Sequence, residues 1–329
     1  MNEQLYQLHL KVAQKVGESR SCGKKTCFLN EEKVQRAADA HNIWEGRQHD
    51  VEAYPCPFCN QWHIGRVMSM EILQVIAKCF ERKNMEILYE GKAKVLYQAH
   101  EPDQIVQYFK DDATAGNGAK KGTIVNKGIM NCAITSRIFK ILNDQAIKTH
   151  FLGKIDDRTI LTKKATLIPL EVVVRNYVAG SLSKRLGIAE GVGLSCPVLE
   201  LYYKNDALND PLINEDHVVA LQLPSPVHDR FVNTQDLNTI KFLAYRVNQE
   251  LRPRFMQIGL ELIDFKLEFG FFPYTGDIIL IDEISPDTCR LWDLNSGERM
   301  DKDRFRRDMG KVEESYKEVQ DRVLSDLFL

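Results

Sequence analysis

The sequence predicts an α+β protein with two lobes around a cleft, preceded by a small N-terminal module. Short strand-like runs follow one another after residue 84, and amphipathic helix patterns come mostly later in the chain instead of alternating with the strands. Four of the eight cysteines fall in the first 60 residues, which sets the start of the chain apart. A length of 329 residues is enough for at least two such units.

The N-terminal module is expected to span residues 1–68. Apolar residues recur at helical spacing over 3–16 and again over 31–42, so both segments are predicted helices. The cysteine-rich segment CPFCNQWH follows at 56–63. An apolar stripe that ends in the polar residues ERKN predicts a linker helix at 69–84.

The main unit, residues 85–329, opens with strand-like runs at 85–91, 93–99 and 105–111, separated by short turns. Such runs are typical of an antiparallel sheet. Amphipathic periodicity then predicts three helices, at 126–145, at 236–258 and, as one long terminal helix, at 302–327.

The charge of the chain is nearly balanced. Charged residues make up 27% and the formal net charge is -2, so neither a nucleic-acid nor a membrane partner is expected from the overall field. No run approaches the roughly 18 apolar residues of a membrane span, and the start lacks the apolar core of a secretory signal. A cytoplasmic location is expected, and its reducing conditions disfavour a disulfide framework.

Two glycine-containing segments suggest contact with a nucleotide. In LYEGKAKVLY, Gly91 allows backbone N–H groups to approach phosphate oxygens while Lys92 and Lys94 supply positive charge, although a solvated basic turn has the same composition. In FKDDATAGNGAKKG at 109–122, acidic, hydroxyl and amide side chains crowd between glycines. They can order a loop around a nucleotide or a metal, or form Asx turns with a purely structural role.

A third segment, IPLEVVVRNYVAGSLSKRLG, is suited to an anionic group. An apolar strand that leads from one lobe toward the other ends at Arg175, and Ser181 lies in the turn that follows. Because Arg175 directly follows a run that is expected to be buried, an ordinary surface arginine is the weaker interpretation.

The most informative pattern is the pair of runs ELIDFKLEFG and IILIDEISPDTCRLWD. Period two places Asp264, Lys266 and Glu268 on one face of the first strand, and Asp282 follows the apolar start of the second. Burying these charges is costly unless a cation or phosphate compensates them. Carboxylates beside a triphosphate suit Mg²⁺, and a structural salt-bridge network is the alternative.

Seven motifs occur in order between residues 85 and 329: LYEGKAK, FKDDATAGNGAKKG, LEVVVRNYVAGSLSKRLG, LYYKNDALNDP, DFKLEFG, DEISPDTCRLWD and MDKDRFRRDMG. Together they resemble the SAICAR synthetase family, the phosphoribosylaminoimidazole-succinocarboxamide synthases of purine biosynthesis. The resemblance implies an ATP-grasp-like fold with ATP between an N-lobe at about 85–170 and a C-lobe at about 171–329. It implies a homodimeric carbon–nitrogen ligase that joins L-aspartate to the carboxylate of carboxyaminoimidazole ribonucleotide through an acyl phosphate, giving SAICAR, ADP and phosphate.

The resemblance also implies roles for individual residues. The ATP site would consist of Gly91, Lys92, Lys94, Glu171 and Lys266. Substrate would be bound by Arg175, Ser181, Lys204, Asp287 and Arg290. Mg²⁺ would be bound by Glu268 and Asp282, which form the catalytic group together with Lys266.

The N-terminal module lies outside that resemblance. It resembles small zinc-ribbon-like proteins in which one cysteine precedes a helix and a CPxCxxWH knuckle. A structural Zn²⁺ takes four thiolate or imidazole ligands, which Cys22, Cys56, Cys59 and His63 supply. Cys27 can replace Cys22 or His63, so the ligand set stays open. The alternative is a helical cap with free thiols, although so short a module is hard to stabilise without a staple.

Two other classes of function compete with the ligase. A small-molecule or lipid kinase built on a related ATP cleft would transfer phosphate to a hydroxyl and would need no amine. A binding protein would use the module to dock nucleic acid or a partner, but the basic residues of the module are interspersed with acidic ones. Arg175, Arg290 and the full series of seven motifs favour the ligase.

Overall fold

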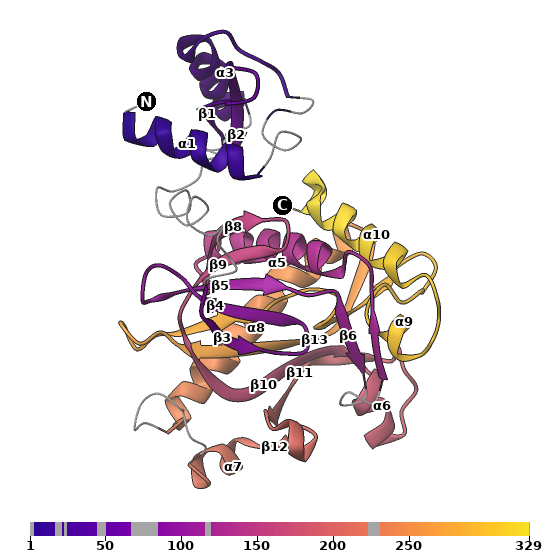
Figure 1. The fold of residues 1–329 in the computed structure, drawn as a ribbon. Helices are drawn as coiled ribbons and strands as arrows, with labels where there is room; N and C mark the ends of the chain where they lie inside the picture. Colours follow the sequence, from indigo (N-terminus) through magenta and orange to yellow (C-terminus); the bar gives the residue numbers. More distant parts are fainter. Residues whose placement is uncertain are drawn as a thin grey trace.

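Two β-sheets form the framework of residues 85–328 (Figure 1). The computed structural model describes residues 3–16, 22, 25–44, 51–66, 85–115, 120–222 and 231–328. Within these residues helices and strands are mixed, and neighbouring strands of both sheets pair antiparallel. The predicted mixture of helices and strands is therefore confirmed.

The first sheet contains the strand-like runs predicted after residue 84. In spatial order its five strands are β3 (Ile87–Glu90), β4 (Lys94–Gln98), β5 (Gln104–Phe109), β9 (Thr159–Lys163) and β8 (Phe151–Asp156). A separate ribbon is formed by β6 (Asp112–Ala115) and β7 (Lys120–Thr123). The helix predicted at 126–145 is α5 (Lys127–Asp144), which packs against β5, β8 and β9.

The second sheet carries most of the hydrophobic core. Its six strands are β12 (Leu212–Ile213), β11 (Gly193–Tyr203), β10 (Thr166–Tyr177), β13 (Leu260–Phe271) and β14 (Ile278–Ile281), with β15 (Cys289–Asp293) also paired to β13. Phe265, Leu267 and Phe269 of β13 are each 1% exposed and belong to this core. The charged residues between them lie on the other face, so the predicted period of two is confirmed for this strand.

Helix α8 (Thr234–Gln257), predicted at 236–258, covers the core side of the second sheet and packs against β10, β13 and β14. Its first turn is closed by a capping box in which Asn233 and Asp236 bond each other's backbone N–H groups. Shorter elements are α6 (Gly180–Leu186), the 3₁₀ turn η2 (Asp206–Leu208) and α7 (Glu215–Ala220).

The two sheets are joined next to the end of β14. Thr149 and Leu280 form an isolated parallel bridge. The His150 N–H donates to the Leu280 carbonyl at 2.8 Å, and the Leu280 N–H donates to the Lys148 carbonyl at 3.0 Å. This junction brings the residues after β14 close to the first sheet.

The prediction of one long terminal helix at 302–327 is wrong. The chain forms α9 (Asp303–Arg306), α10 (Val312–Leu324) and the 3₁₀ turn η3 (Asp326–Phe328). Between α9 and α10, Asp308, Gly310 and Lys311 have φ values of 54°, 69° and 50°. A right-handed helix cannot continue through left-handed residues, so the apolar periodicity holds for α10 alone.

The N-terminal module contains α1 (Glu3–Val16), α3 (Glu31–Trp44) and a hairpin of β1 (Val51–Pro55) and β2 (Trp62–Arg66). Both helices were predicted from their spacing, at 3–16 and at 31–42, and both are confirmed. The predicted linker helix at 69–84 lies outside the described residues, and the proposed domain boundaries stay predictions. None of the helices in the described ranges is long and apolar enough to cross a lipid bilayer.

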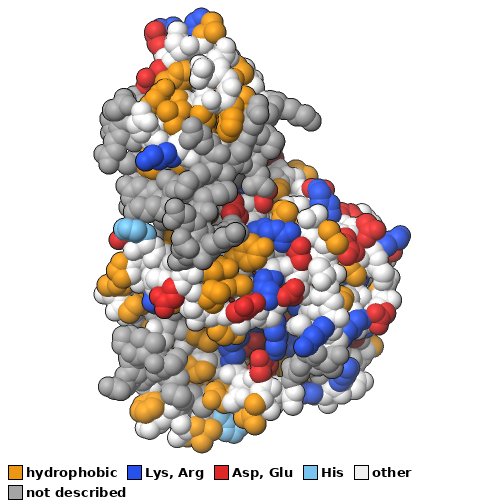
Figure 2. All heavy atoms as spheres, viewed as in Figure 1, with side chains coloured by type: hydrophobic (Ala, Val, Ile, Leu, Met, Phe, Trp, Pro, Cys, Tyr) orange, Lys and Arg blue, Asp and Glu red, His pale blue; other side chains and the backbone are white. Residues whose placement is uncertain are grey.

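The face of the molecule drawn in Figure 2 carries basic and acidic side chains side by side over the main unit. This mixture agrees with the nearly balanced charge of the sequence.

We predict that Leu251→Ala lowers the free energy of unfolding by about 2 to 5 kcal/mol, because the side chain is 0% exposed in the core under α8. Met256→Ala on the same helix is the control, since Met256 is 46% exposed, and its cost should stay within about 0.5 kcal/mol. Urea unfolding of both variants measures the difference. Equal losses would contradict the assignment of the core face of α8.

Candidate active site

Lys94 connects the two sheets at the start of β4. Its ammonium group pairs with the Asp282 carboxylate and lies 3.0 Å from Glu283 Oε1. The preceding turn is closed by a hydrogen bond from the Gly91 N–H to the Lys94 carbonyl at 2.9 Å. Lys92 lies at the outer edge of the same turn and donates to Asp206 Oδ1 at 2.8 Å. The hairpin thus presents one half-buried and one exposed lysine.

A second group of charges lies on β10, β13 and the end of β11. Lys266 Nζ donates to Glu171 Oε1 at 2.8 Å and to Glu268 Oε1 at 2.7 Å. Lys204 Nζ also donates to Glu268 Oε1, at 2.7 Å. Glu171 and Glu268 are direct partners in the register of β10 and β13, which explains why two carboxylates share these lysines.

The electrostatics of this cluster keep Lys94, Asp282 and Glu268 charged. Burial lowers the pKa of Lys94, but Asp282 and Glu283 outweigh that effect and hold it above its usual range. Burial raises the pKa of Asp282, yet Lys94 and Lys266 bring it down to about 2. In Glu268, burial is likewise outweighed by Lys266, and the pKa is lowered.

The cluster as a whole carries a formal net negative charge. Its four carboxyl groups, contributed by Glu171, Glu268, Asp282 and Glu283, face three buried or half-buried lysines. Formally this leaves one negative charge in excess.

Asp282 also has a φ of 70°, and Gln107 Nε2 donates to its carbonyl at 3.2 Å. The left-handed turn directs the chain away from β14 at the point where Lys94 meets it.

Arg175 is fully bonded within the protein. Its guanidinium donates to Glu200 at 2.9 Å, to Asp264 at 2.5 Å and to Ser181 Oγ at 2.9 Å. Longer bonds go to the Ala179 carbonyl and the Tyr202 hydroxyl. These contacts use the five N–H donors of an arginine.

Arg290 lies beside Arg175, and the two share one carboxylate. Asp264 pairs in register with Arg175 across β10 and with Arg290 across β15. Arg290 Nη1 donates to Asp264 at 2.8 Å and its Nε donates to Asp303 at 3.0 Å. Gly180, with a φ of 54°, approaches so closely that a Cβ there would lie 2.4 Å from Arg290 Nη2.

Asp287 lies in the turn before β15, with its side chain 3% exposed. Lys127 Nζ donates to its Oδ2 at 2.7 Å and the Tyr316 hydroxyl donates to its Oδ1 at 2.6 Å. Neither partner was predicted as part of a site. Tyr316 lies in the segment that the sequence predicts as one long terminal helix. A buried tyrosine usually needs a partner for its hydroxyl, but the sequence does not indicate which residue that is.

The acidic start of the segment 109–122 has a structural role. Asp111 accepts two hydrogen bonds from Arg158, at 2.6 and 2.9 Å, and a third from the Gly128 N–H at 2.9 Å. Its carboxylate therefore joins β5 to the start of α5. Residues 116–119 of the same segment lie outside the described residues.

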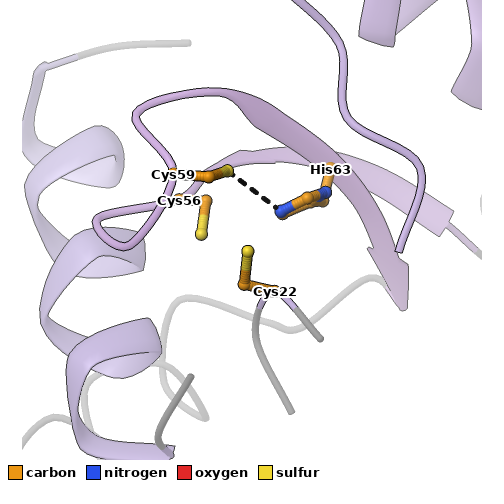
Figure 3. A group of neighbouring side chains, drawn as sticks. All are labelled: Cys22, Cys56, Cys59 and His63. Carbon is orange, nitrogen blue, oxygen red and sulfur yellow. Dashed lines mark hydrogen bonds between the residues drawn. The ribbon is translucent and has the colours of Figure 1, made fainter. Parts of the chain in front are cut away.

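In the N-terminal module, four side chains point toward one another (Figure 3). The ligand atoms of Cys22, Cys56, Cys59 and His63 all lie within 4.8 Å of one another. His63 Nδ1 is 2.8 Å from the Thr26 carbonyl, which leaves Nε2 facing the thiols. Of the two cysteines that the sequence left open, Cys22 is in the group. Cys27 is exposed, with its thiol 3.7 Å from the Lys25 carbonyl, and it also interacts with the Cys59 thiol at the edge of the group.

The SAICAR synthetase family matches residues 87–323. The chain belongs to this family. It is 51% identical over 243 residues to a phosphoribosylaminoimidazole-succinocarboxamide synthase of Clostridium botulinum, covering 74% of this chain and 99% of the relative. The corresponding enzyme of Chlorobaculum tepidum is 52% identical over 238 residues, covering 72% of this chain and 97% of the relative. The predicted family and its ligase activity are confirmed.

Solved structures of the family have the same fold. The crystal structure of the phosphoribosylaminoimidazole-succinocarboxamide synthase of Ehrlichia chaffeensis superposes with a TM-score of 0.68 at 44% identity, covering 72% of this chain and 98% of the other. A SAICAR synthetase solved in complex with ADP gives a TM-score of 0.67 at 44% identity, covering 72% and 97%. The first 86 residues of this chain lie before the family match.

Glu190 links the start of α6 to the C-terminal part of the chain, next to Arg290. It accepts hydrogen bonds from the Gly180 N–H at 2.9 Å, from Arg299 at 2.6 Å and from Arg307 at 2.7 Å. Arg307 is the main cause that lowers the pKa of Glu190 to about 2.

We predict that Glu190→Gln lowers the free energy of unfolding at pH 7, and that the difference from the wild type shrinks as the pH falls from about 4.5 to about 2. The sign follows because a carboxyl with a lowered folded pKa stabilises above its unfolded pKa and loses that effect as it is protonated. Urea unfolding at pH 7, 5, 4 and 3 measures it. A difference that does not depend on pH would contradict this account.

Proposed function

We propose that the cluster around Lys94, Lys266 and Glu268 is the ATP and Mg²⁺ site of an ATP-dependent ligase that joins L-aspartate to carboxyaminoimidazole ribonucleotide. The site would lie between two ATP-grasp-like lobes, the N-lobe at about 85–170 and the C-lobe at about 171–329. The observation that carries this proposal is the ion pair of Lys94 with Asp282, because it places a lysine of the first sheet against the carboxylates of the second.

On the ATP side, Lys92 and Lys94 are proposed to bind the phosphates at the Gly91 turn. Both already lie beside carboxylates, which hold the ammonium groups in place until phosphate oxygens replace them. Glu171 is proposed to contact the nucleoside and Lys266 to assist at the nucleotide. Phosphoryl transfer needs mainly positioning and charge neutralisation, so these residues can act without a protein nucleophile.

Glu268 and Asp282 are proposed to hold Mg²⁺. The donor set fits this ion, because Mg²⁺ typically takes one or two carboxylates together with substrate oxygens and water. The excess of one negative charge in the cluster also favours a cation. When bound, Mg²⁺ would neutralise charge on the phosphoryl group in transfer.

On the acceptor side, Arg290 and Ser181 are proposed to bind the ribonucleotide phosphate. The resemblance assigns Arg175 to the substrate as well, but because its donors are in use here, we propose that it acts by orienting Ser181. Arg175 has its donors in use, whereas Arg290 Nη2 makes no hydrogen bond to any residue in the described ranges. Asp287 is proposed to contact the aminoimidazole. Lys204, at the edge of the ATP cluster, is proposed to reach a substrate carboxylate.

These placements support a reaction in two steps. The imidazole carboxylate attacks the γ-phosphorus, the bond to ADP breaks, and an acyl phosphate forms. The amine of L-aspartate then attacks the acyl carbon, the C–N bond of SAICAR forms, and phosphate leaves. A homodimer and a cytoplasmic location are further proposals, which rest on the resemblance to the family.

We predict that the wild-type chain releases phosphate from ATP only when Mg²⁺, the carboxyaminoimidazole ribonucleotide and L-aspartate are all present. Glu268→Gln should lower kcat/KM by about 100-fold or more, since it removes a proposed metal ligand. Glu215→Gln is the matched control and should keep the kcat/KM of the wild type. Glu215 is an exposed carboxylate that pairs with Lys241, outside the proposed site. Phosphate transfer that needs no amine would instead indicate a kinase.

We further propose that Cys22, Cys56, Cys59 and His63 bind a structural Zn²⁺. Three thiols and one imidazole nitrogen form a closed set of four ligands, as such sites require. The contact of His63 Nδ1 with the Thr26 carbonyl supports this assignment, because metal-bound histidines usually donate their second N–H to an acceptor.

We predict that the purified 329-residue chain contains about one zinc ion, and that Cys22→Ser loses it while Cys27→Ser keeps it. Elemental analysis of the dialysed proteins measures the metal content, and ligase activity shows that the main unit of each variant is folded. Equal zinc content in the two variants would show that the ligand set is wrong.

A further inference from the structure

The turn that holds Asp287 lies between the two halves of the proposed site. It starts after Asp282, the proposed metal ligand, and ends before Arg290, the proposed phosphate ligand. Within it, Ser285 Oγ donates to Glu283 Oε2 at 2.7 Å and accepts from the Asp287 N–H at 3.1 Å. The turn is therefore a defined element between the proposed metal ligand and the proposed phosphate ligand.

The side chain of Asp287 attaches this turn to two distant helices. Lys127 comes from the first turn of α5 and Tyr316 from the middle of α10, and their side chains are 1% and 0% exposed. Lys302 approaches the same carboxylate at 3.6 Å. Burying an ammonium, a carboxylate and a phenol costs free energy unless each is matched, and here Asp287 matches both of the others.

The protonation states keep this network intact. Burial raises the pKa of Tyr316, and the neighbouring Asp287 raises it further, so the phenol remains a donor. Burial alone would raise the pKa of Asp287, but Lys302 and Lys127 hold it well below its usual range, so the carboxylate remains an acceptor. The hydrogen bond between them is therefore present throughout the neutral pH range.

We propose that Tyr316 and Lys127 are positioning residues of the ligase: they fix the Asp287 carboxylate, and with it the turn that presents the ribonucleotide to ATP. This inference rests on the proposed function of Asp287. The two residues act differently. Lys127 compensates the charge of Asp287, whereas Tyr316 contributes one hydrogen bond and thereby the direction in which the carboxylate points.

This difference decides which variant is informative. Removing the Lys127 ammonium would leave a buried carboxylate without its closest charge partner, and the chain could fail to fold for that reason alone. Tyr316→Phe keeps the ring volume and the ion pair of Asp287 with Lys127, and removes only the hydroxyl.

The test compares steady-state kinetics of the wild type and Tyr316→Phe for all three substrates. We expect the KM for the carboxyaminoimidazole ribonucleotide to rise about tenfold. That is the size of effect expected when one hydrogen bond to a charged group, here from Tyr316 to Asp287, is lost. The kcat and the KM for ATP should change less than about twofold, because the ATP cluster lies on other residues. If Tyr316 had a purely structural role, Tyr316→Phe would shift the melting temperature, and the KM for the ribonucleotide would not rise more than the other kinetic constants.

Ser315→Ala is the matched control. Ser315 is the neighbouring residue of α10, is 4% exposed, and bonds only the Lys311 carbonyl of its own helix in the described part of the chain. If Tyr316→Phe behaves like Ser315→Ala, or raises all three KM values alike, the inference is wrong. An inactive wild type would instead refute the proposed ligase, so the two failures are distinguishable.

Discussion

The ion pair of Lys94 with Asp282 is the interaction on which the arrangement of the site depends. The two side chains are 12% and 20% exposed, and removal of either partner would leave the other as an uncompensated, half-buried charge. The pair forms because the bridge of Thr149 with Leu280 brings the end of β14 to the first sheet, and because Asp282 turns the chain there with a φ of 70°. The relative placement of the two sheets therefore decides whether Lys94 can balance the charge of Asp282, the proposed metal ligand.

Strand β13 sets the spacing between the two substrate regions. Lys266 and Glu268 belong to the ATP cluster, and Asp264, on the same face, lies between the two arginines of the acceptor side. At about 3.3 Å per residue, Asp264 and Glu268 lie roughly 13 Å apart along the strand. One extended strand thus places both groups without a flexible connection, which suits a reaction in which the γ-phosphate must reach an acceptor carboxylate.

The features that the sequence could predict are those that depend on local periodicity or on a short motif. The period of two in β13 placed Lys266 and Glu268 on one face, and the family motifs identified the ligase. The break before α10 was missed because left-handed residues such as Asp308 leave the apolar spacing on both sides intact. The roles of Lys127 and Tyr316 were missed because they arise from contacts more than 25 residues apart, which no local pattern records.

The module and the main unit are stabilised in different ways. The main unit buries a large continuous core between the second sheet and its helices, so it needs no cross-link. In the module the described buried apolar residues are few and mostly small, such as Val34, Ala38 and Ala53. Val12 of α1 is also buried, but it belongs to a cluster with residues of the first sheet. Four convergent metal ligands can replace the missing core in a unit of that size. The proposed Zn²⁺ would therefore hold the module together, whereas the main unit depends on its own core.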